Sequence, residues 1–181
     1  MTEPAPPYHG EGPTALWHVS EDDTIRRFDP HRAPTSPLDE KLVWAIDTRH
    51  LPLYWFPRDC PRATFWAVSA TTAADVDAFL GGDRSRRVHV VEPDWLAPLR
   101  TTRVVAYRLP DETFDRWDRF WISREPVEPL ELVEFGDLVL RHEEAGIELR
   151  ARPDLLHLWD DVIASSLDYS GIRLRNARMR P

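Results

Sequence analysis

Short runs of apolar residues, some continuous and some alternating with polar ones, recur along most of the chain. A period of two is typical of a strand with one buried face, and a short continuous apolar run is typical of a strand buried on both faces. The pattern predicts strand segments at residues 15–20, 42–46, 64–68, 87–91, 103–109, 120–123, 130–133 and 147–150. From these eight candidate segments we expect about six or seven mostly short strands in a mixed or antiparallel core.

Apolar residues three or four positions apart mark helices between these strands. Residues 73–80 end at a Gly81-Gly82 stop, and Ser20 is placed to cap a helical turn in which Ile25 and Phe28 share a face. Further helices are predicted at residues 50–56, around 95–99, at 136–144 and at 153–166. Strands with peripheral helices of this kind predict one α+β domain over residues 14–181.

The first 13 residues have a different character, with four prolines, two glycines and almost nothing apolar. Such a stretch cannot bury enough surface to offset its ordering entropy, so residues 1–13 are predicted to form a disordered tail. They also lack the basic and apolar regions of a signal peptide.

Composition limits the classes of function. A content of 42% apolar residues suffices for a buried core, and a formal net charge of −8 argues against coating nucleic acid through phosphate contacts alone, while leaving a local basic cleft open. Cys60 is the only cysteine, which excludes an internal disulfide and favours a reducing compartment. No segment approaches the roughly 20 apolar residues that span a bilayer. We therefore expect a cytoplasmic protein without a membrane partner, of open oligomeric state.

The first candidate for chemistry is the strand Leu16-Trp17-His18-Val19-Ser20. With a period of two, His18 and Ser20 point to the same face of this strand. One interpretation is a core histidine beside a capping serine. The other is a pair of side chains that orient a ligand in a cleft.

The second candidate is Pro57-Arg58-Asp59-Cys60-Pro61-Arg62. The prolines restrict the backbone around Arg58 and Arg62, whose guanidiniums are suited to bidentate binding of a phosphate or carboxylate. The same arginines would lower the pKa of Cys60 if they lay near its sulfur, which gives a reactive thiolate as an alternative. Ion pairs with neighbouring acids are the purely structural interpretation.

Two further segments carry charge near predicted strand ends. Glu125 and Glu128 follow the strand at 120–123, either as an acid/base group or as solvated turn carboxylates. Residues 170–178 are rich in arginine, and form either a docked tail or an anion-contact patch. The sequence has no Gly-rich phosphate loop, no nucleophile elbow and no Cys/His cluster with zinc spacing, so no metal site is predicted.

Several blocks give the chain a family resemblance. They are His-Val-Ser-Glu, Val-Trp-Ala-Ile-Asp, Pro-Arg-Asp-Cys-Pro-Arg, Ile-Ser-Arg-Glu-Pro-Val and Arg-Asn-Ala. With these blocks, the stretch from Leu16 to Ala177 resembles an uncharacterised bacterial family of unknown function, which implies no activity.

The N-terminal half also resembles the ADP-ribosyltransferase fold. The matching residues are His18, Ser20, Ile25, Phe28, Pro30, Trp44 and Tyr54. The resemblance implies that the histidine binds the ribose of NAD, that an aromatic side chain stacks on nicotinamide, and that a glutamate on a later strand polarises the ribose. The chain departs from the pattern at Phe120-Trp121-Ile122, where that glutamate is expected, and Glu125 is the nearest candidate.

These observations together predict a protein that binds a nucleotide or phosphorylated small molecule, NAD among them, in an ADP-ribosyltransferase-like cleft. The expected ligand-binding residues are His18, Ser20, Trp44, Tyr54, Arg58 and Arg62, with Glu125 as the candidate catalytic acid. Because the glutamate is displaced, binding is better supported than transferase activity. The alternatives are a non-catalytic interaction module that uses the Arg-rich C-terminal tail, and a thiol enzyme that uses Cys60.

Overall fold

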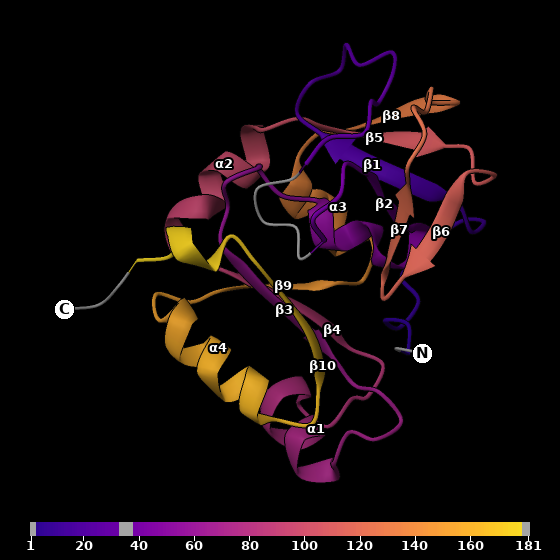
Figure 1. Ribbon diagram of the computed structural model, residues 1–181. Helices are drawn as coiled ribbons and strands as arrows, with labels where there is room; N and C mark the ends of the chain where they lie inside the picture. The colour runs from indigo at the N-terminus through magenta and orange to yellow at the C-terminus, as the bar shows by residue number, and fades with distance from the viewer. Residues whose placement is uncertain (1–2, 33–37, 179–181) are drawn as a thin grey trace.

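The computed structural model describes residues 3–32 and 38–178, which form two β-sheets surrounded by helices (Figure 1). The strands are β1 (Leu16–Ser20), β2 (Val43–Asp47), β3 (Arg62–Trp66), β4 (Arg87–Val91), β5 (Val104–Leu109), β6 (Phe114–Trp117), β7 (Phe120–Ser123), β8 (Glu131–Phe135), β9 (Glu148–Ala151) and β10 (Asp168–Ile172). The prediction of an α+β fold is confirmed. The described part of the chain has ten strands, against the expected six or seven. Eight of them overlap the eight candidate segments, and β6 and β10 were not predicted.

One sheet has six antiparallel strands in the order β6-β7-β2-β1-β5-β8. The other has four strands in the order β10-β3-β4-β9, and it is mixed because β9 runs parallel to β4. The predicted edge strand near residues 147–150 is β9, which lies at one edge of this second sheet.

The four-stranded sheet is buried on both faces. Along β3, Ala63 and Phe65 pack on one face while Trp66 packs on the other, as the period of two requires. The outer face is covered by α1 (Ala73–Leu80) and α4 (Leu155–Ala164), which lie side by side below the sheet in Figure 1. The inner face contributes to the core shared with the six-stranded sheet.

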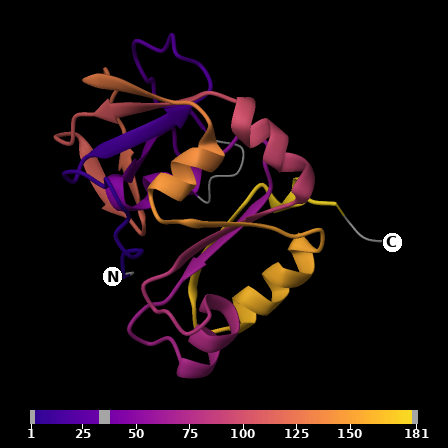
Figure 2. The same ribbon diagram turned by 180° about the vertical axis from the view of Figure 1, so that it is seen from behind.

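Shorter helices fill the junction between the sheets. They are the 3-10 helices η1 (Thr48–Tyr54), η2 (Pro93–Trp95) and η3 (Leu174–Asn176), and the α-helices α2 (Leu96–Thr101) and α3 (Leu138–Glu144). Figure 2 shows α2 and α3 at the back of the molecule, where they pack against each other. Leu99 of α2 and Leu138 of α3 are fully buried in the shared core, together with Trp55 just after η1.

The N-terminal segment differs from the predicted disordered tail over residues 3–13; residues 1 and 2 lie outside the described residues. Ala5 and Tyr8 are buried in the shared core. The Tyr8 hydroxyl donates to the Thr48 carbonyl at 3.1 Å, and the backbone N–H of His9 donates to the carbonyl of Ala145 at 3.0 Å. The buried side chains of Ala5 and Tyr8 and these long-range hydrogen bonds hold the proline-rich segment against the domain. Local composition cannot indicate such contacts.

The helical turn predicted after Ser20 is wrong, because residues 21–28 follow an irregular path. The Asp22 carboxylate accepts hydrogen bonds from the backbone and the hydroxyl of Thr24, at 2.8 and 2.6 Å. Tyr107 donates its hydroxyl to the carbonyl of Asp22 at 2.8 Å. These contacts give the backbone an alternative to helical hydrogen bonds.

Within the described ranges, no helix has the length and apolar character needed to cross a bilayer.

Candidate functional site

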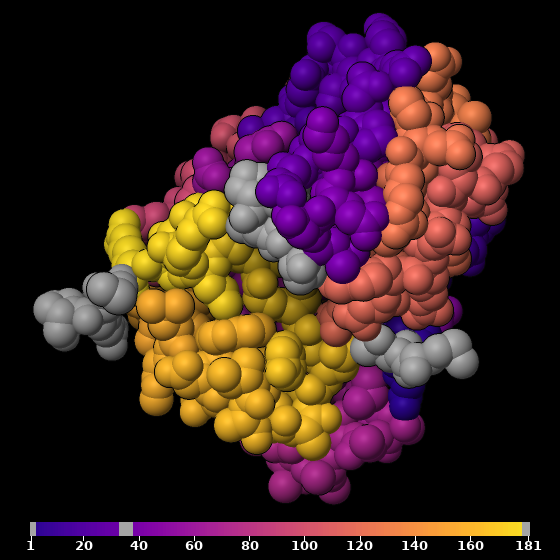
Figure 3. Space-filling view, viewed as in Figure 1, coloured from indigo at the N-terminus to yellow at the C-terminus, as the bar shows by residue number. Residues whose placement is uncertain are grey.

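A cleft of about 670 Å³ is lined by residues of both sheets. Its walls come from β1, β2 and the starts of β5 and β7 on one side, and from the end of η1, β3, β10 and η3 on the other. This volume falls within the range of small-molecule binding sites. Figure 3 shows the C-terminal segment of the second wall, in yellow, beside the purple N-terminal half of the chain.

All six residues predicted to bind a ligand line this one cleft. They are His18, Ser20, Trp44, Tyr54, Arg58 and Arg62. They come from four separate segments of the chain, so their meeting is a property of the fold and not of sequence proximity.

The position of His18 follows from the way β1 and β2 diverge. Their ladder pairs Leu16 with Asp47 and Trp17 with Ile46, and then ends. At the next position the His18 imidazole takes over the role of a backbone group, since its Nδ1 lies 2.9 Å from the carbonyl oxygen of Trp44. The sheet therefore opens at the residue that the sequence singled out.

Burial lowers the pKa of His18, so its ring is neutral at pH 7. A carbonyl oxygen can only accept, so Nδ1 carries the proton and donates to Trp44. Nε2 then has a free lone pair and can accept a hydrogen bond from a ligand hydroxyl. The ring also packs against Phe28, with centroids 4.7 Å apart, which fixes its orientation.

Arg62 is buried and is held by two backbone carbonyls. Its Nε donates to Leu53 at 3.0 Å and its Nη1 donates to Cys60 at 3.0 Å. The guanidinium carbon lies 4.8 Å from the centre of the Phe56 ring and 5.7 Å from that of Tyr54. Burial lowers its pKa to about 10, so it stays charged at neutral pH. Among the described residues, no carboxylate forms an ion pair with it.

The turn after β1 is tied to the segment that carries Arg58. Glu21 accepts a hydrogen bond from the backbone N–H of Arg58 at 2.7 Å, and Ser20 accepts one from the N–H of Asp22 at 3.1 Å. The Arg58 side chain is exposed and makes no hydrogen bond or ion pair with a described residue. It is therefore free to contact a ligand.

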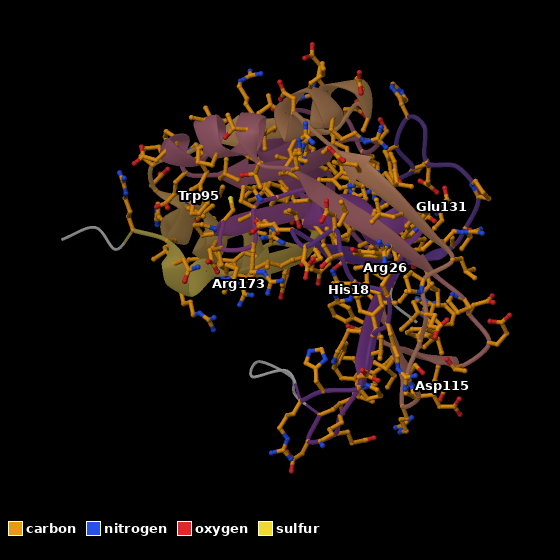
Figure 4. All side chains as sticks on the ribbon, turned by 90° about the horizontal axis from the view of Figure 1, so that it is seen from above. His18, Arg26, Trp95, Asp115, Glu131 and Arg173 are labelled. Carbon is orange, nitrogen blue, oxygen red and sulfur yellow. The ribbon has the colours of Figure 1, made fainter. Side chains whose placement is uncertain are left out.

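Sequence reasoning missed part of the lining. Glu21, Phe56 and Phe120 face the cleft, as do Arg173 and Arg175 of the C-terminal segment. Figure 4 labels His18 and Arg173, which belong to the two ends of the domain sequence and to opposite walls. The arginine-rich composition of residues 170–178 was a signal for an anion-contact patch, but nothing local indicated that it faces His18.

The candidate acid Glu125 does not join this group. It is exposed, it is not among the lining residues, and its backbone N–H donates to the Ser123 hydroxyl at 3.1 Å. Its assignment as an acid stays a prediction with no support from the geometry.

The thiol hypothesis for Cys60 required that nearby arginines lower the pKa of the thiol below its usual value, and this premise is wrong. Cys60 is fully buried, and burial raises the pKa of its thiol to about 12 despite the proximity of Arg62. Desolvation outweighs the favourable charge of Arg62, and the negative charge of Glu92 also raises the pKa of this thiol. Over residues 3–32 and 38–178, no three His, Cys, Asp or Glu side chains form a group that could hold a metal ion.

Comparison with the curated proteins and with the solved structures gives no match. The likeness to the ADP-ribosyltransferase fold therefore stays a prediction. A family model described as a family of unknown function (DUF6886) matches residues 17–177, which include all of β1 except Leu16, the residues that line the cleft, and η3. Because this match covers almost the whole chain, the protein belongs to the DUF6886 family.

Proposed function

We propose that the cleft binds a nucleotide or another phosphorylated small molecule, with NAD among the candidate ligands. The observation that carries the proposal is the charge of the lining. Among the described residues that line the cleft there are four arginines, at positions 58, 62, 173 and 175, and one carboxylate, that of Glu21. In a chain with a net charge of −8, such a local surplus is not a consequence of average composition.

Arginine is suited to this role because its planar guanidinium binds phosphate oxygens in pairs. Arg62 is the strongest support. Its charge lies in the interior without a carboxylate partner among the described residues. A buried cation without a counter-charge is costly, and a bound anion would offset that cost.

The aromatic part of the lining suits the base or another flat group of a nucleotide. Trp44, Tyr54, Phe56 and Phe120 border the cleft. Stacking of a base on an aromatic ring contributes about 1–3 kcal/mol, and it tolerates different bases. The free Nε2 of His18 adds an acceptor for a sugar hydroxyl, which is the role that the resemblance implies for this histidine.

The proposal is binding and not ADP-ribosyl transfer. Transfer through an oxocarbenium-like transition state needs a carboxylate directed at the ribose. Glu125 is not part of the lining, and Glu21 accepts a hydrogen bond from the backbone of Arg58. The alternative of an interaction module has less support, since Arg178 pairs with Asp94 while Arg173 and Arg175 face the cleft.

The test is isothermal titration of the full chain with NAD, ADP-ribose and inorganic phosphate. We expect one of the nucleotides to bind, and Arg58→Ala to weaken it about tenfold, because a charge-assisted contact is lost without disturbing a protein partner. Arg152→Ala is the matched control, since this exposed arginine pairs with Asp154 outside the cleft lining. No heat with any ligand, or equal losses in both variants, would contradict the proposal.

A further inference from the structure

We infer that the C-terminal segment, residues 171–175, forms half of a diphosphate-binding wall in the cleft, and that the preferred ligand carries two adjacent phosphates. This inference rests on the proposed function. It assigns Arg173 and Arg175 as ligand-binding residues. They are distant in sequence from Arg58 and Arg62 but line the same cleft. The substrate class is a nucleoside diphosphate or a dinucleotide, not a nucleoside monophosphate.

The backbone at Arg173 is the first observation. Its φ of 58° lies in the left-handed region, which side chains with a Cβ rarely adopt. In this conformation Nε of Arg173 donates to the carbonyl of Arg58 at 3.2 Å. The unusual backbone thus joins the C-terminal segment to the arginine-bearing loop after η1, and leaves the Nη groups of Arg173 for another partner.

The second observation is that few carboxylates balance the positive charges of these guanidiniums. Arg173 lies close enough to Arg62 that its charge contributes to lowering the pKa of Arg62, after the larger effect of burial. Arg173 forms a long ion pair with Asp59, whose carboxylate lies 4.0 Å from Nε. The side chains of Arg58 and Arg175 have no hydrogen-bond or ion-pair partner among the described residues. Arginines gathered in this way favour an anionic ligand.

The number of guanidiniums indicates the size of that anion. Arg62 keeps only Nη2 after its hydrogen bonds to the carbonyls of Leu53 and Cys60, whereas Arg58, Arg173 and Arg175 each keep both Nη groups. Because a terminal phosphate has three oxygens, two paired contacts already share one of them, so three guanidiniums that can bind in pairs match two adjacent phosphates better than one. A single phosphate would leave part of the wall uncompensated.

The segment is also held in place before any ligand binds. Asn176 donates from Nδ2 to the carbonyl of Asp59 at 2.8 Å, and the backbone N–H of Arg178 donates to Glu92 at 2.8 Å. Upstream, β10 pairs with β3 from Asp168 to Ile172. The wall is therefore preorganised, which reduces the entropy lost on binding.

The experiment compares AMP, ADP and inorganic pyrophosphate by isothermal titration, with wild type, Arg175→Gln and the double variant Arg173→Gln/Arg175→Gln. We expect wild type to bind ADP at least about tenfold more tightly than AMP, and the double variant to lose most of this preference. Arg175→Gln removes no protein contact with a described residue, so its smaller loss of preference is independent of folding. Arg178→Gln, three residues after Arg175 and outside the cleft lining, is the matched control and should keep the full preference.

The inference is overturned if AMP and ADP bind equally well to wild type, or if the double variant keeps the ADP preference. Either result would leave nucleotide binding in the cleft intact. If NAD, ADP-ribose and ADP all fail to bind wild type, the proposed function fails as well. If pyrophosphate alone binds as tightly as ADP, the diphosphate wall is supported and the aromatic contribution is not.

Discussion

Two buried histidines, His89 and His142, lie beneath the cleft, where Phe56 packs against both rings at centroid distances of 5.6 and 5.0 Å. His142 Nδ1 lies 2.6 Å from the carbonyl of Leu138, and its Nε2 lies 2.9 Å from Nδ1 of His89. The geometry requires each Nδ1 to donate, which leaves His89 Nε2 as an acceptor without a hydrogen-bond partner in the described part of the chain. Both rings are uncharged because burial lowers their pKa values.

This pair predicts a loss of stability in mild acid. Burial lowers the pKa of His142 to about 4, and the charges of Arg87 and Arg141 act in the same direction. The unfolded chain binds protons near pH 6.5 while the native chain does not, so the free energy of unfolding falls as the pH drops from about 6.5 towards 4. His142 alone accounts for on the order of 3 kcal/mol over this window.

Urea unfolding between pH 7 and pH 5 measures the effect before most carboxylates titrate. His142→Gln should flatten the pH dependence, whereas His157→Gln, at an exposed position, should leave it unchanged. An equally steep pH dependence in all three proteins would show that the buried pair is not its source.

At this scale the sequence identified the cleft residues that lie on patterned strands. His18 and Trp44 could be found because apolar neighbours define their strands and make a polar or aromatic exception visible. The pair of His89 and His142 could not be found, because the two residues are 53 positions apart and meet through the packing of α3 on β4.

Among the elements, β10 is the strand that sequence patterning missed and on which the second wall of the cleft depends. Its residues are half-buried or exposed, and it contains Gly171, so neither a continuous apolar run nor a period of two is present. β6 was missed for a related reason, because Asp115 and Arg116 occupy its centre. By contrast, β4, β7 and α1 have the predicted bounds, since each has a clear pattern or an N-cap and glycine stop.

Gly171 gives a prediction at the level of this element. A Cβ at this position would lie 2.6 Å from the Trp159 ring and 2.7 Å from a Leu174 methyl group, so β10 could not keep its place against α4 and η3. We expect Gly171→Ala to lower the free energy of unfolding by about 1–3 kcal/mol, as overpacking does in other cores.

Gly136→Ala is the matched control, because a Cβ there meets nothing within 4 Å and its φ is not in the left-handed region. Denaturant unfolding of both variants makes the comparison. Equal stability of the two would mean that β10 is not closely packed on α4, and the preorganisation of the second wall would be in doubt.

At the scale of the whole molecule, the sequence predicted the class of fold but not its arrangement. The strands of each sheet come from both halves of the chain, and β10 pairs with β3 across about a hundred residues. Such pairings depend on tertiary packing that local patterns do not encode. The cleft is a product of this arrangement, because it forms where β1 and β2 separate and the C-terminal segment crosses from the second sheet.

The central claim is that a phosphorylated nucleotide binds between the two sheets, and hydrogen exchange with and without saturating ADP-ribose tests it most directly. We predict slower amide exchange in peptides covering residues 18–21, 54–62 and 171–176, and unchanged exchange in α1, which lies on the outer face of the four-stranded sheet. Protection confined to other segments, or none at all, would contradict the account.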